Sequence, residues 1–493
     1  MEFLKKKLEI LKDKNLYLFL AVTLIFFGIF IIKDYTIDSY IFFQETWKEP
    51  FLHFLDLGRI VTAMLWLIVS WTNYDIFYIV SIIIAFITTT LSMYELNKIL
   101  EKDISNKNIT KIISIIAIIN FCTLELYMFV EKGIMMLSVL MIILAIKRLD
   151  KALEGDKKSN IIILIEMFIA NCCYQGTVGL FVVFGTFYII KHSKKIIDFI
   201  KNNVIVALLY AIPAILNYLI VKVMFNSERV TNSIPLGTKL DQISYAVKNI
   251  LENTFGILPK YMFISMVILF AAIFIVKTLY NKEKINMKIC NIFWVFYIII
   301  AIILSAVAPQ IMQSYVYIVP RNTYPLGALI AIIIMLLYYK YKNGKVLNIM
   351  TTTISVAFLF VLFFNFMDIN IGHYYTNRKD MEIAKEIATI VENYEKESGK
   401  QITKVVLYDG SENKKTEYEG VRHIGDANTR AFYATWGVQG ILDNVLHRQI
   451  TIEDKKDEEI EKYFSNQNWK YFNENQVKIK DDTLHLLVIS EIT

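Results

Sequence analysis

The sequence predicts a helical protein that crosses a membrane many times and ends in a small domain outside that membrane. Mean hydropathy is +0.45, and 55% of the 493 residues are hydrophobic while only 20% are charged. Apolar runs of spanning length recur along the chain as far as residue 367, and residues 368–493 are polar and acidic. Soluble proteins hold about 25% charged residues, so this composition excludes a wholly soluble chain.

The apolar runs locate the expected spans. A spanning helix needs about 20 mostly apolar residues. Eleven such runs lie near 16–32, 76–96, 109–124, 127–146, 160–175, 177–190, 203–222, 259–276, 291–308, 322–339 and 347–367. The first outer loop, 34–71, is expected to hold amphipathic helices. Its apolar run 60–71 is too short to cross and is expected to lie along the membrane surface, with Trp66 and Trp71 at the interface.

Basic residues orient these spans. With residues 60–71 outside the bilayer and the N-terminus in the cytoplasm, the inner segments hold 25 Lys and Arg and the outer segments hold 10. If residues 60–71 crossed, the numbers would become 12 inside and 23 outside. Because cytoplasmic loops are enriched in Lys and Arg, the first topology is predicted, with the C-terminal domain on the extracytoplasmic side.

Residues 368–493 form a second expected domain. They carry 17 basic and 23 acidic residues, whereas residues 1–367 carry 35 and 23. Helical periodicity covers 380–396, buried strands are expected at 404–410 and 484–489, and a helix is expected within 429–445. We therefore expect a membrane domain, 1–367, and a small α/β domain, 368–493. Basic residues that lie in loops do not indicate nucleic-acid binding.

Polar residues from distant parts of the chain fall at the outer ends of the spans. They are Asp34, Asp38, Asp56, Arg59, Glu125, Tyr127, Tyr174, Gln175 and Arg321. Acids, an amide and arginines gathered at one membrane face indicate a site. A carboxylate there can act as a general base, and arginine binds phosphate through its planar fork. This combination suits sugar transfer from a phosphate-linked donor. Ordinary loop solvation is the alternative.

Four pieces of the sequence, taken in order, resemble a known family. Asp38-Ser39-Tyr40 follows the first span, and Leu57-Gly58-Arg59 comes about twenty residues later. Leu124-Glu125-Leu126-Tyr127 marks the third outer end and Tyr174-Gln175 the fifth. Over roughly residues 20–330 the chain resembles the multi-span GT-C glycosyltransferases, closest to the serotype-converting Gtr-type glucosyltransferases that use polyprenyl-phosphate sugars.

The resemblance implies an inverting hexosyl transfer, with glucose as the expected sugar, at the outer face of a bacterial plasma membrane. Asp38 would be the general base, and Asp34 is the other candidate. Arg59 and Arg321 would steady the polyprenyl phosphate of the donor. The residues implied to bind the sugar donor or the cell-surface glycan acceptor are Glu125, Tyr127, Tyr174, Gln175 and Tyr40. Many GT-C enzymes have two adjacent acids in this loop, but here three residues separate Asp34 from Asp38. That departure leaves the identity of the base and a divalent metal (Mg or Mn) open.

Other chemistry-bearing residues receive a structural interpretation. No histidine pair has metal-ligand spacing, so no metal ligand is assigned. Trp436 is expected in the core of the C-terminal domain rather than as a sugar platform. Glu166, in the middle of a span, is expected to make a structural hydrogen bond inside the bundle, because an unpaired acid in a bilayer is costly.

Two other functions compete with transfer. A transporter or flippase of a lipid-linked glycan would place polar, interrupted helices near the bilayer midplane, often in repeated halves. The sequence shows no such repeat, and its polar residues gather at one face instead. A membrane-anchored binding or assembly protein could act through its outer domain, which is large enough to fold alone.

Overall fold

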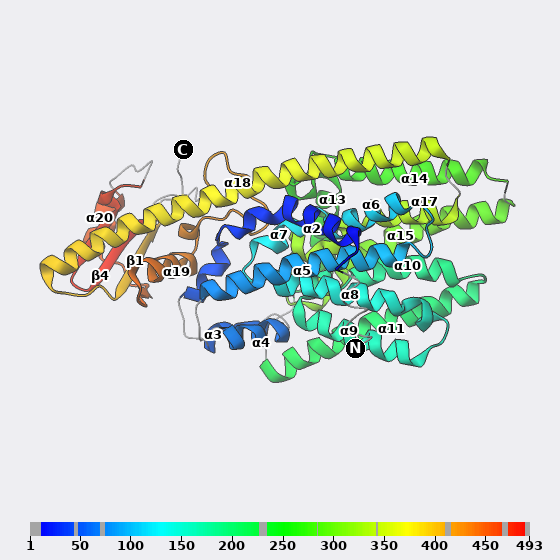
Figure 1. Ribbon diagram of the computed structural model, residues 1–493. Helices are drawn as coiled ribbons and strands as arrows, with labels where there is room; N and C mark the ends of the chain where they lie inside the picture. Colours follow the sequence, from blue (N-terminus) through cyan, green and yellow to red (C-terminus); the bar gives the residue numbers. More distant parts are fainter. Residues whose placement is uncertain are drawn as a thin grey trace.

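In the computed structural model, long helices run side by side, and a small sheet with its own helices lies at one end of the bundle (Figure 1). The structure describes residues 11–43, 48–69, 74–225, 234–282, 284–341, 344–409, 416–465 and 472–488. The apolar core of the bundle includes side chains from nearly every long helix, among them Phe27, Met135, Phe184 and Leu362.

Seven helical segments in the described residues are long and apolar enough to cross a membrane. They are Lys14–Ile31 (α2, Lys14–Phe27, with η1, Gly28–Ile31), Ile76–Leu100 in α5 (Tyr74–Leu100), Ile196–Phe225 (α11, Ile196–Ile220, with η4, Val221–Phe225), α14 (Met262–Tyr280), Ile285–Ile311 in α15 (Ile285–Met312), Pro320–Lys340 (η6, Pro320–Thr323; α16, Tyr324–Gly327; α17, Leu329–Lys340) and α18 (Lys345–Ser398). Each coincides with an expected span. The chain is therefore a helical membrane protein.

The other four expected spans are helices that do not meet the length and composition of a full crossing. They are α6 (Lys107–Ile118), α8 (Lys132–Leu153), α9 (Lys157–Cys173) and α10 (Leu180–His192). With 12 and 13 residues, α6 and α10 are about 18–20 Å long at 1.5 Å per residue, against a hydrocarbon core of roughly 30 Å. α8 begins at buried Lys132 and carries Lys147 and Arg148 in its last third.

Short helices fill the loop between α2 and α5, as expected. They are η2 (Ile37–Phe43), α3 (Lys48–Asp56) and α4 (Ile60–Val69). Trp66 of α4 is only 4% exposed, and its ring centroid lies 5.5 Å from that of Phe42 and 5.2 Å from that of Phe77. The expected interface position of Trp66 is therefore wrong, because packing among aromatic rings buries its large apolar surface. Trp71 lies outside the described residues.

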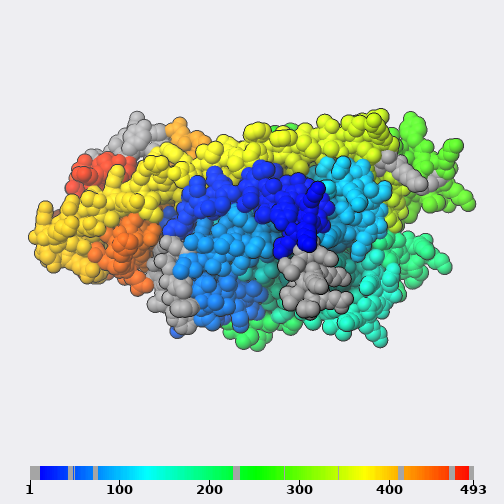
Figure 2. Space-filling view, in the orientation of Figure 1, coloured from blue at the N-terminus to red at the C-terminus, as the bar shows by residue number. Residues whose placement is uncertain are grey.

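The longest helix, α18, joins the membrane part to the C-terminal domain. Its 54 residues would measure about 80 Å at 1.5 Å per residue. In Figure 2 its yellow surface runs along one edge of the molecule to the orange and red C-terminal domain. The expected boundary at residues 367/368 falls inside this helix. Composition changes there from apolar to charged, but both halves keep a helical pattern.

The C-terminal domain is a four-stranded mixed sheet with helices on both faces. Its strands are β1 (Lys404–Asp409), β2 (Thr451–Glu453), β3 (Val477–Lys480) and β4 (Thr483–Val488), in the order β2-β1-β4-β3. β1 is parallel to β2 and β4, and β3 is antiparallel to β4. Both expected strands form, and residues 410 and 489 lie outside the described part. The sheet packs on α18 and α19 (Thr435–Leu446) on one face and on α20 (Glu458–Ser465) on the other.

Helix α19 is fixed directly on η2, the segment that follows the first span. The Cβ of an alanine at Gly440 would lie 2.0 Å from the carbonyl oxygen of Tyr40. At Gly437 the added Cβ would lie 2.9 Å from Ile37 Cγ1. These two glycines, three residues apart, lie on one face of α19 and let its backbone approach η2 closely. The contact ties the C-terminal domain to the segment that carries Asp38.

Candidate functional site

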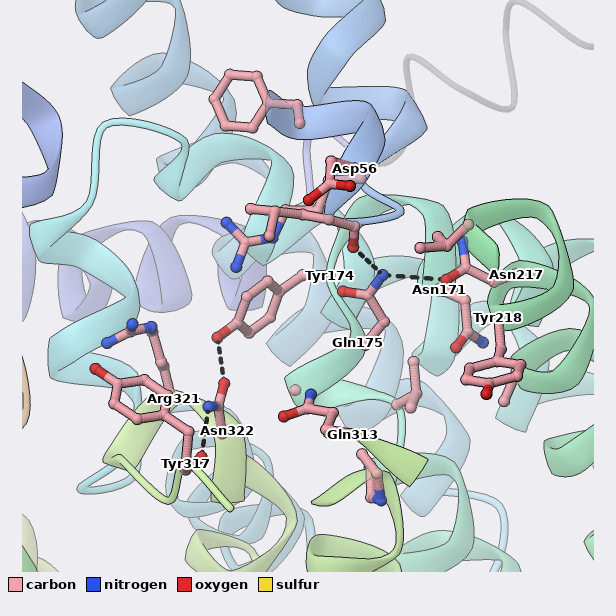
Figure 3. A pocket seen from close by; sticks show the side chains of 18 of the residues that line it. Asp56, Asn171, Tyr174, Gln175, Asn217, Tyr218, Gln313, Tyr317, Arg321 and Asn322 are labelled. Carbon is pink, nitrogen blue, oxygen red and sulfur yellow. Dashed lines mark hydrogen bonds between the residues drawn. The ribbon is translucent and has the colours of Figure 1, made fainter. Parts of the chain in front are cut away.

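A cavity of about 510 Å³ opens where the membrane part meets the C-terminal domain. Its walls come from η2, α3, the residues between α7 (Thr123–Met128) and α8, the end of α9, α11, the end of α15, η6 and the start of α19. Figure 3 shows part of it. The polar and aromatic residues of its lining include Asp38, Ser39, His53, Asp56, Arg59, Glu131, Tyr174, Gln175, Asn217, Tyr317, Arg321, Asn322 and Trp436.

Amide side chains tie the outer loop to the floor of the cavity. Gln175 Nε2 donates hydrogen bonds to the carbonyl oxygen of Leu57 at 3.0 Å and to Asn217 Oδ1 at 3.1 Å (Figure 3). Asn217 Nδ2 donates to the carbonyl oxygen of Gly58 at 2.9 Å. Gly58 has φ +71°, a conformation that glycine adopts easily, and a Cβ there would meet Asn217 at 2.8 Å. These contacts fix the position of the neighbouring Arg59.

Arg59 lies between an acid and an aromatic ring. Its Nη1 pairs with Glu131 Oε1 at 2.7 Å, and its guanidinium carbon lies 4.8 Å from the ring centroid of Tyr174. The Tyr174 hydroxyl donates to Asn322 Oδ1 at 2.8 Å (Figure 3). Arg59, Tyr174 and Gln175 were predicted from the sequence to belong to the site, and all three line the cavity. Glu131 also lines the cavity but was not predicted, although an acidic residue in a mostly apolar outer segment could have identified it as a site residue.

Arg321 is held between two carboxylates. Its Nη1 contacts Glu125 Oε1 and its Nη2 contacts Asp426 Oδ2, each at 2.6 Å. Glu125 also accepts hydrogen bonds from the backbone nitrogens of Arg321 at 2.8 Å and Asp426 at 3.1 Å. Burial raises the pKa of the Glu125 carboxyl, and the charge of Arg321 opposes that shift. With both acids ionised, this triad carries one net negative charge.

Asp426 brings the C-terminal domain into the site, and no pattern in the sequence marked it. It lies 301 residues from Glu125 and reaches it from a turn in which Gly425 has φ +56°. A Cβ at Gly425 would lie 2.3 Å from Glu125 Oε1, so the turn fits there only with glycine. The Tyr317 hydroxyl also donates to Asp426. The C-terminal domain therefore contributes a residue to the site.

Asp38 lines the cavity from the first turn of η2. Burial raises its pKa from 3.8 to about 6, the charge of Asp426 adds to this increase, and Arg321 opposes it. A carboxylate that titrates near pH 6 and faces a cavity can accept a proton from a bound hydroxyl at neutral pH. Of the two acids proposed as base, Asp38 is the one that reaches the cavity.

Asp34 lies in a closed environment instead. It does not line the cavity, and its side chain is buried. Burial raises its pKa to about 6, opposed by the charge of Lys132. The Nζ atom of Lys132, itself buried, lies 3.8 Å from the ring centroid of Tyr78. Asp34 therefore serves as a nearby opposite charge for a buried lysine and does not contact the space in which a substrate would bind.

Two aromatic residues that were expected to bind sugar lie in the protein interior. The ring of Tyr127 stacks on that of Phe27 with 3.8 Å between centroids, and its hydroxyl lies 2.6 Å from Thr89 Oγ1. Tyr40 is buried beneath α19 and does not line the cavity. Both rings gain more from burial than from an exposed position at a span end. Glu125 does not line the cavity either, but it reaches the site through Arg321.

Two further residues were assigned structural roles from the sequence. Trp436 is 44% exposed and lines the cavity, so the expected core position is wrong. Glu166 pairs with Arg148 of α8 at 3.3 Å, which agrees with a structural role inside the bundle. Within the described residues, no group of three or more His, Cys, Asp or Glu side chains is arranged to hold a metal ion. The carboxylates Glu125, Glu131 and Asp426 pair with arginines.

Comparisons of the chain with protein-family models, with curated proteins and with solved structures found no match. The chemistry of the site therefore has to be inferred from its own residues. The cavity combines an accessible carboxylate, two arginines, several amides and aromatic rings. Such a lining can bind a polyhydroxylated molecule by hydrogen bonds and by contact with its C–H faces, and it can remove a proton from one hydroxyl.

Proposed function

We propose that the protein is an inverting GT-C-type glycosyltransferase with eleven spans and a cytoplasmic N-terminus. It transfers a hexose, expected to be glucose, from polyprenyl phosphate to a cell-envelope glycan at the outer face of a bacterial plasma membrane. One observation carries the proposal. Asp38 lines a cavity whose walls come both from α11, a helix long and apolar enough to cross a membrane, and from the C-terminal α/β domain. Its volume of about 510 Å³ is within the range of small-molecule sites.

The wall formed by α11 supports a lipid-linked donor. Tyr210, Ala214, Ile215 and Tyr218 line the cavity from this helix. Ile215 is also 47% exposed, next to Leu216, which is equally exposed. In a span, exposed apolar side chains of this kind contact lipid. A prenyl chain could therefore remain in the bilayer beside α11 while its phosphate and sugar enter the cavity.

The short helices support the same placement. Tyr324 of α16 donates a hydrogen bond to the carbonyl oxygen of Ile118, the last residue of α6, at 2.7 Å. The Tyr174 hydroxyl, just after α9, donates to Asn322, so the ends of α6 and α9 both meet the segment that carries Arg321. If the inner ends of α6 and α10 lie at the cytoplasmic surface, their outer ends lie below the outer surface, because both helices are shorter than the hydrocarbon core is thick. That depth suits the phosphate of a lipid-linked sugar.

The proposed reaction is a single displacement. The oxygen of an acceptor hydroxyl attacks the anomeric carbon of the donor, and the proton of that hydroxyl passes to Asp38. The bond between the anomeric carbon and the phosphate oxygen breaks, and its electron pair stays on polyprenyl phosphate. Arg59 and Arg321 line the cavity where they can stabilise that anion, in competition with Glu131, Glu125 and Asp426. Asp38 then releases the proton to water.

The test is transfer by purified protein in lipid nanodiscs. Radiolabelled polyprenyl-phosphate glucose, galactose and mannose are each supplied with a crude envelope extract. The expected result is label in glycan from one donor with wild-type protein, and at least a hundred-fold slower transfer with Asp38→Asn, as general bases typically contribute about 10²–10⁴. No transfer from any donor, together with equal flipping of a lipid-linked glycan by both proteins in liposomes, would favour the transporter.

A further inference from the structure

Trp436 differs from the other tryptophans that the structure describes. Trp66 and Trp294 are 4% and 7% exposed, whereas Trp436 is 44% exposed. An indole carries a large apolar surface, and leaving much of it in contact with water forgoes the free energy of burial. Trp436 lines the cavity of about 510 Å³, whose walls also carry polar side chains. An aromatic ring in such a wall is suited to contact a ligand.

The chain holds Trp436 in a fixed relation to the proposed base. Trp436 is the second residue of α19, and the helix continues into Gly437 and Gly440, which pack directly on η2. Asp38 lies in the first turn of η2. Both side chains line the same cavity, from two elements in backbone contact. A ligand that contacts the indole can therefore present a group to the carboxylate without a change in the position of either element.

The cavity has two chemically different sides. The α11 side is part of a span, with Ile215 open to lipid, and accommodates the lipid-linked donor. The Trp436 side belongs to the domain outside the membrane, so it faces the compartment from which a water-soluble glycan would arrive. A sugar ring presents C–H groups on its faces and hydroxyls at its edge. An indole can contact the face by dispersion and hydrophobic contact, which leaves the hydroxyls for polar residues.

We propose that Trp436 is the platform on which the acceptor sugar ring stacks, so that the C-terminal domain supplies the acceptor subsite. Asp38, which lines the same cavity, takes the proton of the attacking hydroxyl. This assignment rests on the proposed transferase function. It makes the C-terminal domain a determinant of acceptor specificity, while the membrane part determines the donor.

A binding experiment tests the platform without turnover. Full-length protein in nanodiscs, with no donor, is mixed with the methyl glycosides of glucose, galactose, rhamnose and N-acetylglucosamine, and saturation-transfer NMR is recorded. Wild-type protein and Trp436→Phe are expected to saturate the ring C–H protons of at least one glycoside, and Trp436→Ala is expected to lose at least ten-fold in affinity. Tyr245→Ala, which removes a 74% exposed ring from α13 (Leu236–Asn253), is the matched control. Binding to none of the four by wild type, or equal binding by Trp436→Ala, would overturn the proposal.

A kinetic experiment separates this proposal from the transferase function. With crude envelope extract as acceptor, Trp436→Ala is expected to raise the half-saturating extract concentration at least ten-fold, while the maximal rate and the donor KM change less than three-fold. Trp436→Phe should restore the wild-type value. Transfer that is unaffected by Trp436→Ala would refute the platform and leave the transferase function intact. Trp436-dependent glycoside binding without transfer from any donor would refute the transferase function and leave the sugar site.

Discussion

Asp34 and Asp38 belong to one short segment after the first span, yet the structure gives them different surroundings. Burial raises the pKa of each carboxyl to about 6. Asp38 lines a cavity, and the charges of Asp426 and Arg321 act on its pKa. Asp34 does not line the cavity and is buried near Lys132. A raised pKa therefore reports burial in both places. Access to a cavity is what distinguishes a candidate base from a structural counter-charge.

The two environments also involve the C-terminal part of the chain differently. Asp34 is influenced by the charge of Lys132 of α8, and the backbone of the next residue, Tyr35, is hydrogen-bonded to Asn377 of α18. The segment that carries Asp38 packs on α19, and the charge of Asp426 acts on Asp38 together with charges of the membrane part. Catalysis at Asp38 should therefore depend on the docking of that domain, whereas the Asp34 environment should affect mainly the stability of the bundle.

The largest expected effect separates the two acids by rate. Asp38→Asn should slow sugar transfer by about 10²–10⁴, the usual contribution of a general base. Asp34→Asn should change the rate less than ten-fold, because its side chain does not reach the cavity. Both variants are assayed at pH 7.5 with the same donor and extract. Equal loss in the two variants would remove the distinction between them.

Stability provides the control for Asp38→Asn. A folded-state pKa of about 6, above the ordinary 3.8, means that the folded protein binds this proton more tightly than the unfolded chain does. The associated stabilisation is complete below about pH 4 and is lost as pH rises to about 6. At pH 7.5 the ionised carboxylate is therefore unfavourable, and the neutral amide should leave the unfolding temperature equal or higher. A lower unfolding temperature would mean that lost activity reflects lost structure.

The next effect concerns the triad that attaches the C-terminal domain near Asp38. Arg321→Met leaves Glu125 and Asp426 without their cation, and breaking a buried ion pair costs about 3–5 kcal/mol. Arg378→Met removes an exposed pair with Glu382 and should cost about 0.3–0.5 kcal/mol. Denaturant unfolding of the purified protein measures both. Similar costs for the two variants would show that the triad contributes no more than a surface pair.

A smaller effect tests the docking of α19 on η2. Gly440→Ala places a Cβ 2.0 Å from the carbonyl oxygen of Tyr40, which is backbone and cannot rotate away. Such overpacking should cost about 1–3 kcal/mol, and transfer should fall because η2 carries Asp38. Gly237→Ala, in a helix with no atom within 4 Å of the added Cβ, should instead stabilise by about 0.4–1 kcal/mol. Unchanged transfer in Gly440→Ala would show that Asp38 does not depend on this contact.

Much of the fold was predictable because its signals are local. All seven apolar helices coincide with expected runs, and β1 and β4 form at 404–409 and 483–488. The domain boundary was not predictable from the sequence, because α18 changes from apolar to charged residues and stays helical throughout. Full crossing by α6, α8, α9 and α10 stays a prediction, because α6, α9 and α10 are shorter than the usual span and α8 carries charged residues near both ends. Trp66 was misplaced because burial in an aromatic cluster competes with an interface position.

The site was predictable only in part, for a different reason. Asp38, Arg59, Tyr174, Gln175 and Arg321 lie at span ends or in the first outer loop, which hydropathy locates, and all five line the cavity. Tyr127 and Tyr40 lie equally near span ends, but which way a side chain points depends on tertiary packing. Asp426 and Trp436 come from a separate domain, and nothing in their local sequence reports a contact with residues 300 positions away. Such long-range contacts required the folded structure.

The most direct test of the account is the pH dependence of sugar transfer in wild type and in Asp34→Asn. If Asp38 is the base, the rate should fall about ten-fold per pH unit below an apparent pKa near 6, because only the ionised carboxylate accepts the proton. The same acid limb should persist in Asp34→Asn, although Asp34 has a similar pKa. A rate that is flat from pH 5 to 8, or a limb that disappears in Asp34→Asn, would contradict the assignment of Asp38.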